Sequence, residues 1–337
     1  MRNVLVTGGT GYIGSHTCVA LVEAGYRVVV LDNLSNSSHV ALQRVEAITG
    51  TKIPFVQADI RDQEAVEGAL NQYGCDAVIH FAALKAVGES IHKPMQYYDN
   101  NVVGTHRLLQ AMQAHSVKTL VFSSSATVYG EPQQLPIKEN HPLSATNPYG
   151  RSKLFIEDML RDIYMSDPAW CISLLRYFNP VGAHASGLIG EDPNGVPNNL
   201  MPFVAQVAIG KREKVNVWGS DYPTHDGTGV RDYIHVSDLA QGHVKALAAL
   251  THAQCNAINL GTGQGYSVLE VISEFQQASG QHIAYNLCER RQGDVASCYA
   301  DPSAALQILD WSAQKDLAAM CKDQWNWQAK NPNGYGT

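Results

Sequence analysis

Residues 3–14 read NVLVTGGTGYIG, a short apolar run that leads into glycines at every third position. The apolar run predicts a buried strand, and the apolar residues that follow Gly14 predict a helix as far as Ala24. Gly8, Gly11 and Gly14 allow a tight turn and let the backbone approach a pyrophosphate that faces the start of the helix. Strand, glycine loop and helix in this order are the context of a dinucleotide-binding loop.

A second predicted strand, residues 27–31, ends in Asp32-Asn33. A carboxylate at this place accepts hydrogen bonds from the ribose 2′-OH and repels a 2′-phosphate, which favours NAD over NADP. The other interpretation of Asp32 is a plain turn residue. A third predicted strand, residues 53–56, leads to Asp59-Ile60, where we expect the adenine ring.

Strand patterns recur at residues 77–81, 117–122 and 172–176, and helical patterns separate them, including a long helix expected at 94–115. Six strands separated by helices predict an α/β fold with a doubly wound parallel sheet of the Rossmann type. Ligands of such sheets bind at the carboxyl ends of the strands. We therefore expect one site to form from Asp32, Asp59, Ala82, Ser125 and Tyr177.

The character of the sequence changes after Pro180. Residues 182–199 are rich in Gly, Pro and Asn and show no clear periodicity, and so long an irregular stretch is usually functional. Shorter helix and strand patterns follow. We predict an NAD-binding domain at residues 1–180 and a smaller α/β substrate domain at 181–337, from which the chain can cross back once to the sheet.

Residues 147–153, NPYGRSK, have the pattern of a helix start, because Asn147 is a good N-cap and Pro148 suits the first helical position. Tyr149 and Lys153 are four residues apart and share a helix face. A neighbouring ammonium and a helix N-terminus both lower the pKa of a phenol, which is ordinarily near 10. The pair can thus make Tyr149 a general base. The alternative is an ordinary surface pair.

The composition is that of an ordinary enzyme, with 16% charged and 45% apolar residues among 337. A net charge of −7 and the absence of a basic run argue against nucleic-acid binding. No apolar run approaches the ~18 residues of a membrane span, and a strand pattern at the third residue argues against a signal peptide. Seven cysteines without a C-x-x-C pair favour reduced thiols in a cytoplasmic protein over disulfides or a metal site.

The glycine loop, the stretch SSSATVYG at residues 123–130 and the Tyr149-x-x-x-Lys153 pair together resemble the extended short-chain dehydrogenase/reductases. Further stretches look like the UDP-glucose 4-epimerase family, and this resemblance covers nearly the whole chain. They are DNN at 99–101, LRYFNPVGA at 175–183, PNNL at 197–200, GTGVRDYIHV at 227–236, RR-x-GD at 290–294 and W-x-W at 325–327.

The resemblance implies NAD-dependent, reversible epimerisation at C4 of UDP-glucose and UDP-galactose through a 4-keto sugar. Tyr149 would exchange the proton of the 4-OH, Ser125 would hydrogen-bond the same oxygen, and Lys153 would bind the nicotinamide ribose and lower the Tyr149 pKa. The positive nicotinamide would assist. The family is usually a homodimer joined by a four-helix bundle, here expected from the helices at 94–115 and 149–166.

The resemblance also implies two sets of binding residues. The cofactor set is Gly8, Gly11, Tyr12, Ile13, Gly14, Asp32, Asn33, Asn36, Ser37, Asp59, Ile60, Phe81, Ala82, Ala83, Lys85, Asn100, Ser125, Tyr149, Lys153 and Phe178. The substrate set is Lys85, Ser125, Tyr149, Tyr177, Asn179, Asn199, Leu200, Val215, Asn216, Val217, Trp218, Arg231, Arg291, Asp294 and Cys298. Arginines suit phosphate oxygens, although Arg231 could instead pair with its neighbour Asp232.

Two positions refine the expected specificity. Related dehydratases carry an Asp-Glu pair where this chain has Ala126-Thr127, so the acid that dehydration needs is missing. Cys298 stands where some family members have Tyr, and a small side chain there leaves room for an N-acetyl group on C2 of the sugar. The other interpretations are a buried small residue, or a shift of one position that makes Tyr299 the gate. The rival functions are a nucleotide-sugar decarboxylase or reductase and a silent NAD sensor.

Overall fold

The computed structural model describes residues 2–291 and 293–336, and its centre is a parallel sheet of seven strands. The opening stretch forms strand β1 (Asn3–Thr7) and helix α1 (Tyr12–Glu23), as its pattern predicts. The α/β fold with a doubly wound parallel sheet is confirmed. In spatial order the strands are β10 (Gln254–Leu260), β6 (Cys171–Tyr177), β5 (Thr119–Ser123), β4 (Ala77–His80), β1, β2 (Arg27–Asp32) and β3 (Phe55–Gln57).

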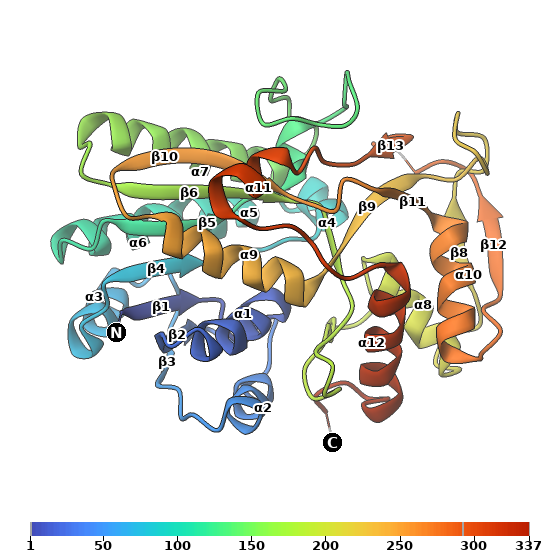
Figure 1. Ribbon diagram of the computed structural model, residues 1–337, viewed down its shortest axis with the longest axis horizontal. Helices are drawn as coiled ribbons and strands as arrows, with labels where there is room; N and C mark the ends of the chain where they lie inside the picture. The colour runs from blue at the N-terminus through green and yellow to red at the C-terminus, as the bar shows by residue number, and fades with distance from the viewer. Residues whose placement is uncertain (1, 292, 337) are drawn as a thin grey trace.

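Helices cover both faces of this sheet (Figure 1). Helices α1, α2 (His39–Thr49) and α9 (Val236–Ala249) share one apolar core, and α3 (Gln63–Tyr73), α6 (Gly104–Ala114) and α7 (Pro148–Ser166) share the other. Side chains along β1 alternate between these cores, since Val4 and Val6 enter the first and Leu5 the second. Both faces are therefore buried, and the strand ends remain as the place for ligands.

The helix expected at residues 94–115 contains a wider turn. Helix α5 (Pro94–Tyr97) passes into the π-helical segment η1 (Tyr98–Val103) before α6 continues. Within η1, Asn101 is buried and bonds both backbone groups of Leu84, accepting from its N–H at 2.8 Å and donating to its carbonyl at 3.0 Å. The π turn thus carries Asn101 against the loop that follows β4, next to Asn100 of the predicted set.

Most of the remaining strands form smaller sheets at the right of Figure 1. Strand β9 (Val230–His235) pairs with β7 (Asn179–Val181), β11 (Gly265–Ser267) and β13 (Ser297–Cys298), and β8 (Val215–Trp218) pairs with β12 (Tyr285–Cys288). Helices α8 (Leu200–Ala208), α10 (Val268–Ser279) and α12 (Leu317–Lys330) pack on one apolar core. The short helices are α4 (Val87–His92), η2 (Ala126–Tyr129) and α11 (Ser303–Leu309).

Strand β10 and helix α9 lie with the central sheet although they belong to the second half of the chain. The division at residue 180 follows from the sequence pattern alone and stays a prediction. None of the helices in the described ranges has the length and hydropathy to cross a bilayer.

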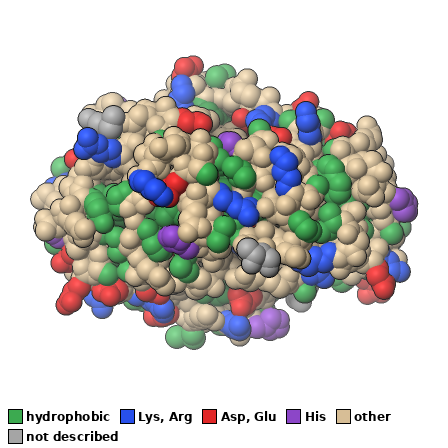
Figure 2. Space-filling model, turned by 90° about the horizontal axis from the view of Figure 1, so that it is seen from below, with side chains coloured by type: hydrophobic (Ala, Val, Ile, Leu, Met, Phe, Trp, Pro, Cys, Tyr) green, Lys and Arg blue, Asp and Glu red, His purple; other side chains and the backbone are tan. Residues whose placement is uncertain are grey.

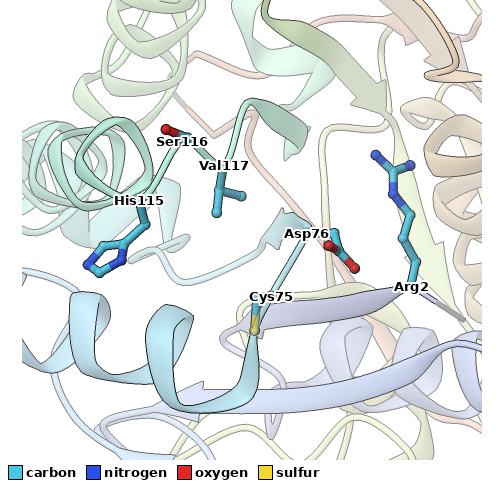
Figure 3. Close-up of a pocket in the computed structure, with 6 residues that line it drawn as sticks. All are labelled: Arg2, Cys75, Asp76, His115, Ser116 and Val117. Carbon is cyan, nitrogen blue, oxygen red and sulfur yellow. The ribbon is translucent and has the colours of Figure 1, made fainter.

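Two surface features lie away from the carboxyl ends of the central strands, where we expect the ligand site. On the face in Figure 2, Lys and Arg side chains are scattered among acidic and apolar ones rather than gathered into a patch. Figure 3 shows a pocket whose lining includes Arg2, Asp76 and Val117. Arg2 directly precedes β1, Asp76 directly precedes β4, and Val117 lies shortly before β5. This pocket is at the amino ends of the strands, at the opposite edge of the sheet from the glycine loop.

Candidate active site

The glycine loop has the geometry of an anion cradle. Gly8 has a φ of +72°, and a Cβ there would lie 2.7 Å from the backbone nitrogen of Ala82. A Cβ on Gly14 would lie 2.2 Å from the Gly8 carbonyl oxygen. The N-cap of α1 is Gly11, and no side chain caps this helix end. Because the first N–H groups of a helix lack intrahelical partners, this end can bind a diphosphate.

Asp32 joins the end of β2 to the glycine loop. Its buried carboxylate accepts hydrogen bonds from the Thr10 N–H at 3.2 Å, the Leu34 N–H at 2.9 Å and the Ser37 hydroxyl at 2.9 Å. A carboxylate has about four acceptor positions, so a ribose hydroxyl can still bind. Asp32 thus orders a turn and still has an acceptor position for a ribose hydroxyl, so the two interpretations, a turn residue and a nucleotide-binding residue, are compatible.

The remaining members of the cofactor set lie at the same edge of the sheet, in the loops after the strands or in the first turn of α1. Asn33 donates to Asp59 at 2.9 Å, which ties the loop after β2 to the loop after β3. The other members of the cofactor set are Tyr12 and Ile13 at the start of α1, Asn36 after β2, Ile60 after β3, Phe81, Ala82, Ala83 and Lys85 after β4, and Phe178 after β6.

Helix α7 presents the predicted catalytic pair from its first turns. The side chain of Asn147 caps the helix by accepting from the Gly150 N–H at 2.9 Å. Tyr149 and Lys153 are both buried, which rules out the ordinary surface pair. The Lys153 ammonium donates to the Ser123 carbonyl at 2.8 Å and lies 6.0 Å from the centre of the Tyr149 ring.

The protonation of this pair depends on its burial. Burial raises the pKa of the Tyr149 phenol far above its usual value, while a hydrogen bond with Ser125 acts in the opposite direction. Burial lowers the pKa of Lys153 to about 7, with the Glu157 carboxylate opposing that shift. For the protein groups alone, burial therefore sets the direction of the Tyr149 pKa, and the lowering expected from Lys153 and the helix terminus stays a prediction.

Three further hydroxyls converge near the phenol. The Ser125 hydroxyl accepts from the Thr127 N–H at 3.2 Å and from the Thr127 hydroxyl at 3.0 Å, and it is close enough to Tyr149 to affect the pKa of that phenol. Ser123 donates to the Tyr177 phenol at 3.0 Å, and burial raises the Tyr177 pKa. Tyr149, Ser125 and Tyr177 therefore offer exchangeable protons at the carboxyl ends of β5 and β6.

A buried ion pair that the sequence pattern does not reveal supports this arrangement. Glu157, one turn after Lys153, accepts from Arg176 at 2.6 and 2.9 Å and from the Ser124 hydroxyl at 2.6 Å. Arg176 also donates to the Tyr129 phenol at 3.0 Å. Burial raises the pKa of Glu157, but these partners outweigh burial and hold it below its usual value. The network fixes α7 against the residue that precedes Ser125.

Arg231 and Cys298 are register partners on β9 and β13. Arg231 donates to the Val230 carbonyl at 2.9 Å, and within the described ranges no carboxylate pairs with it. Its neighbour Asp232 is buried and accepts instead from the N–H groups of Thr262 and Ala300 at 2.9 and 3.1 Å. The salt-bridge alternative for Arg231 is thus wrong, and its guanidinium remains available to an anion.

The other substrate candidates differ in how well they are placed. Arg291 and Asp294 pair with each other at 3.1 Å. Along β8, Asn216 and Trp218 are exposed, whereas Val215 and Val217 are buried in the core beneath. Asn179 begins β7, and Leu200 begins α8 directly after Asn199.

One polar residue of the site was missed by the sequence reasoning. Glu191 is buried in the irregular stretch, where it accepts from Lys85 at 3.1 Å and from Asn199 at 2.7 Å. An acid in a stretch without periodicity gives no signal of its burial or of partners so distant in sequence, and its neighbour Asp192 is exposed. Glu191 thus connects a predicted cofactor residue with a predicted substrate residue.

Comparison with known proteins decides the family. The family model described as GDP-mannose 4,6 dehydratase matches residues 5–324. A UDP-glucose 4-epimerase of Bacillus subtilis is 59% identical over 98% of this chain and 98% of its own length. The human UDP-glucose 4-epimerase is 58% identical over 100% of this chain and 99% of its own. The chain belongs to the UDP-glucose 4-epimerase family.

The family also accounts for the fold. The crystal structure of the UDP-glucose 4-epimerase from Bifidobacterium longum in complex with NAD+ and UDP has a TM-score of 0.96 and 54% identity, covering 99% of this chain and 100% of its own. The sequence resemblance to UDP-glucose 4-epimerases is therefore confirmed, and this member of the family is an isomerase that acts on sugars.

Proposed function

We propose that this epimerase uses NAD to interconvert UDP-glucose and UDP-galactose by inverting C4 of the hexose through a 4-keto sugar. The observation that carries the proposal is the convergence of Tyr149, Ser125 and Lys153 at the strand ends beside the glycine cradle. The cradle and Asp32 suit a dinucleotide that lacks a 2′-phosphate. The Bifidobacterium longum relative was crystallised with NAD+ and UDP, which supports both ligands.

The chemistry divides between the bound NAD and the side chains. NAD supplies the carbon that accepts the C4 hydride and later returns it to the opposite face of the sugar, so no other oxidant is needed. Tyr149, as phenolate, removes the 4-OH proton and gives it back to the same oxygen, while the Ser125 hydroxyl donates to that oxygen. The sugar turns over about its phosphate link between the two transfers.

The Tyr149 phenolate needs more positive charge than the chain itself provides. Burial raises its pKa, and the pKa of Lys153 is lowered to about 7. An oxidised nicotinamide beside the phenol would add a fixed positive charge in a site of low dielectric, where an opposite charge favours ionisation. We therefore assign Lys153 to hold the nicotinamide ribose and share in stabilising the phenolate, rather than to ionise it alone.

The UDP portion is assigned to the smaller sheets. Arg231 has a guanidinium without a carboxylate partner and suits a diphosphate oxygen. Arg291 and Asp294 would hold the diphosphate and ribose from the next loop, and the exposed face of β8 would lie along the uracil. Asn179, Asn199 and Leu200 would complete the set, with Lys85 and Tyr177 near the sugar.

The test is turnover of UDP-galactose by the purified protein without added NAD. We expect UDP-glucose as product and a loss of turnover by orders of magnitude in Tyr149→Phe, with circular dichroism and NAD content measured to check that the variant folds and binds NAD as the wild type does. A decarboxylase or reductase would not convert UDP-galactose to UDP-glucose, and a net oxidation of the sugar would appear as free NADH. A silent sensor would be indifferent to Tyr149→Phe. Dehydration is disfavoured because η2 carries Ala126-Thr127 in place of an acid pair.

The pocket of this epimerase also accommodates UDP-GlcNAc and UDP-GalNAc in our proposal. Cys298 is a small, half-buried residue beside Arg231, and burial raises its pKa to about 11, so the thiol is neutral. A small side chain leaves space at C2 that a phenol would fill. Wild-type enzyme should turn over UDP-GalNAc and Cys298→Tyr should lose that activity selectively; an inactive wild type would overturn the idea.

We further propose that the enzyme is a cytoplasmic homodimer. A groove between α6 and α7 is lined by Leu109, Met159 and Ile163 among others, and Phe155 on its rim is 50% exposed and stacks on Tyr98. Two such faces would form the four-helix bundle expected from the family. All seven cysteines are free thiols, as in reducing compartments. Light scattering should give twice the chain mass, and Phe155→Glu should give monomers.

A further inference from the structure

The irregular stretch between β7 and α8, residues 182–199, runs beside α12 and close to the C-terminal end of the chain (Figure 1). It is attached at widely separated points. Tyr12, at the start of α1, donates to the Gly182 carbonyl at 2.6 Å, and the Trp327 indole on α12 donates to the Glu191 carbonyl at 3.3 Å. This stretch therefore connects the glycine cradle to the C-terminal helix.

The side chain of Glu191, within this stretch, is buried and has two polar partners. It is 6% exposed, and one carboxylate oxygen accepts from both the Lys85 ammonium at 3.1 Å and the Asn199 amide at 2.7 Å. Lys85 follows β4, and Asn199 is the N-cap of α8. A Cβ on Gly190 would lie 2.4 Å from the Trp327 ring, so the backbone before Glu191 is packed tightly against α12. The carboxylate is thus held between the loop that follows β4 of the central sheet and the start of α8.

Burying a carboxylate costs free energy unless the charge is paired. A carboxylate near a bound diphosphate would also repel the negative phosphate groups. Its presence here is explained by the two groups it orients. Lys85, whose ammonium also lies 5.9 Å from the centre of the Tyr12 ring, would otherwise sample many rotamers, because its side chain is 48% exposed. Pairing with Glu191 removes that freedom before a ligand binds.

We propose that Glu191 is a positioning residue that fixes Lys85 and Asn199 on the two sides of the nucleotide-sugar site. The proposal rests on the proposed function for the identity of the ligand. Glu191 itself touches neither the reacting atoms nor the phosphates, and acts through the two side chains that it holds. Its loss should therefore weaken binding of the UDP-sugar more than the chemical step.

The test uses the NAD-containing holoenzyme and three variants. Glu191→Ala removes both contacts and should raise KM for UDP-galactose about tenfold or more, with kcat within about threefold of wild type, the size expected for losing charge-assisted hydrogen bonds. Glu191→Gln keeps an acceptor oxygen for Asn199 and should be intermediate. Asp192→Asn is the matched control, because it removes a negative charge from the next residue in the chain. The Asp192 side chain is exposed and accepts from the Tyr335 N–H, so this variant should leave KM unchanged.

A double-mutant cycle separates positioning from general support of the loop. If Glu191 acts through Lys85, then Glu191→Gln should have a clearly smaller effect on KM in a Lys85→Met background than in the wild type. Equal effects in both backgrounds would overturn that coupling. An unchanged KM in Glu191→Ala, or an equal rise in Asp192→Asn, would overturn the proposal, as would a fall in kcat and Tm together without a rise in KM.

The outcome is distinguishable from failure of the proposed function. Absence of wild-type turnover would overturn the epimerase proposal, while calorimetric titration of UDP into the holoenzyme would still test Glu191. The expected result is a Kd for UDP about tenfold higher in Glu191→Ala than in wild type and unchanged in Asp192→Asn. Equal Kd values in all three proteins would overturn the positioning role whatever the activity.

Discussion

The buried pair of Arg176 and Glu157 gives the sharpest prediction of stability. Their side chains are 2% and 0% exposed, and they are joined at 2.6 and 2.9 Å. Arg176→Met leaves a buried carboxylate with the Ser124 hydroxyl and the partly exposed Arg161 as its partners. Removing one member of such a pair costs about 3–5 kcal/mol, because the remaining charge is desolvated without compensation. We therefore expect Arg176→Met to lose about that much of its free energy of unfolding.

Arg161 provides the matched control, since it binds the same carboxylate from a side chain that is 36% exposed. Arg161→Gln should cost at most about 1 kcal/mol, as surface pairs do. Replacing both members of the buried pair, as Arg176→Met with Glu157→Leu, should cost less than Arg176→Met alone. Urea unfolding at constant NAD concentration measures all four proteins. Equal losses of unfolding free energy for Arg176→Met and Arg161→Gln would show that burial of the remaining carboxylate carries no extra cost.

Two further predictions concern the cradle and the catalytic lysine. Gly14→Ala should lose bound NAD, because the new Cβ would lie 2.2 Å from the Gly8 carbonyl oxygen. The control is Gly68→Ala on α3, whose Cβ would meet nothing within 4 Å and which should keep its NAD. The NAD content of the two purified variants measures the difference. Burial lowers the Lys153 pKa to about 7, so between about pH 7 and 10 the unfolded chain binds more protons and the stability of cofactor-free protein rises with pH. Lys153→Met should flatten that rise, and an unchanged slope in denaturant unfolding would contradict it.

Local signals in the sequence predict the elements that carry the site. The N-cap and proline before Tyr149 place the start of α7. The glycine spacing predicts the turn after β1 because φ and close packing there are local requirements. Parallel strand order then brings the strand ends together without knowledge of any tertiary contact.

The features that the sequence does not predict depend on contacts between distant residues. The π turn that buries Asn101 is set by the Leu84 backbone, and no pattern within 94–115 marks it. Glu191 finds its partners in Lys85, more than a hundred residues away, and in Asn199. The raised pKa of Tyr149 follows from its depth of burial, which spacing relative to Lys153 does not reveal.

The central claim is that Tyr149 is ionised at neutral pH once oxidised NAD is bound, although burial alone raises its pKa. An ultraviolet difference titration of phenolate absorbance, wild type minus Tyr149→Phe and both loaded with NAD, measures this directly. We expect the phenol at position 149 to ionise near neutral pH in the loaded enzyme and far above pH 9 after NAD is removed. A loaded enzyme in which this phenol stays protonated above pH 9 would contradict it.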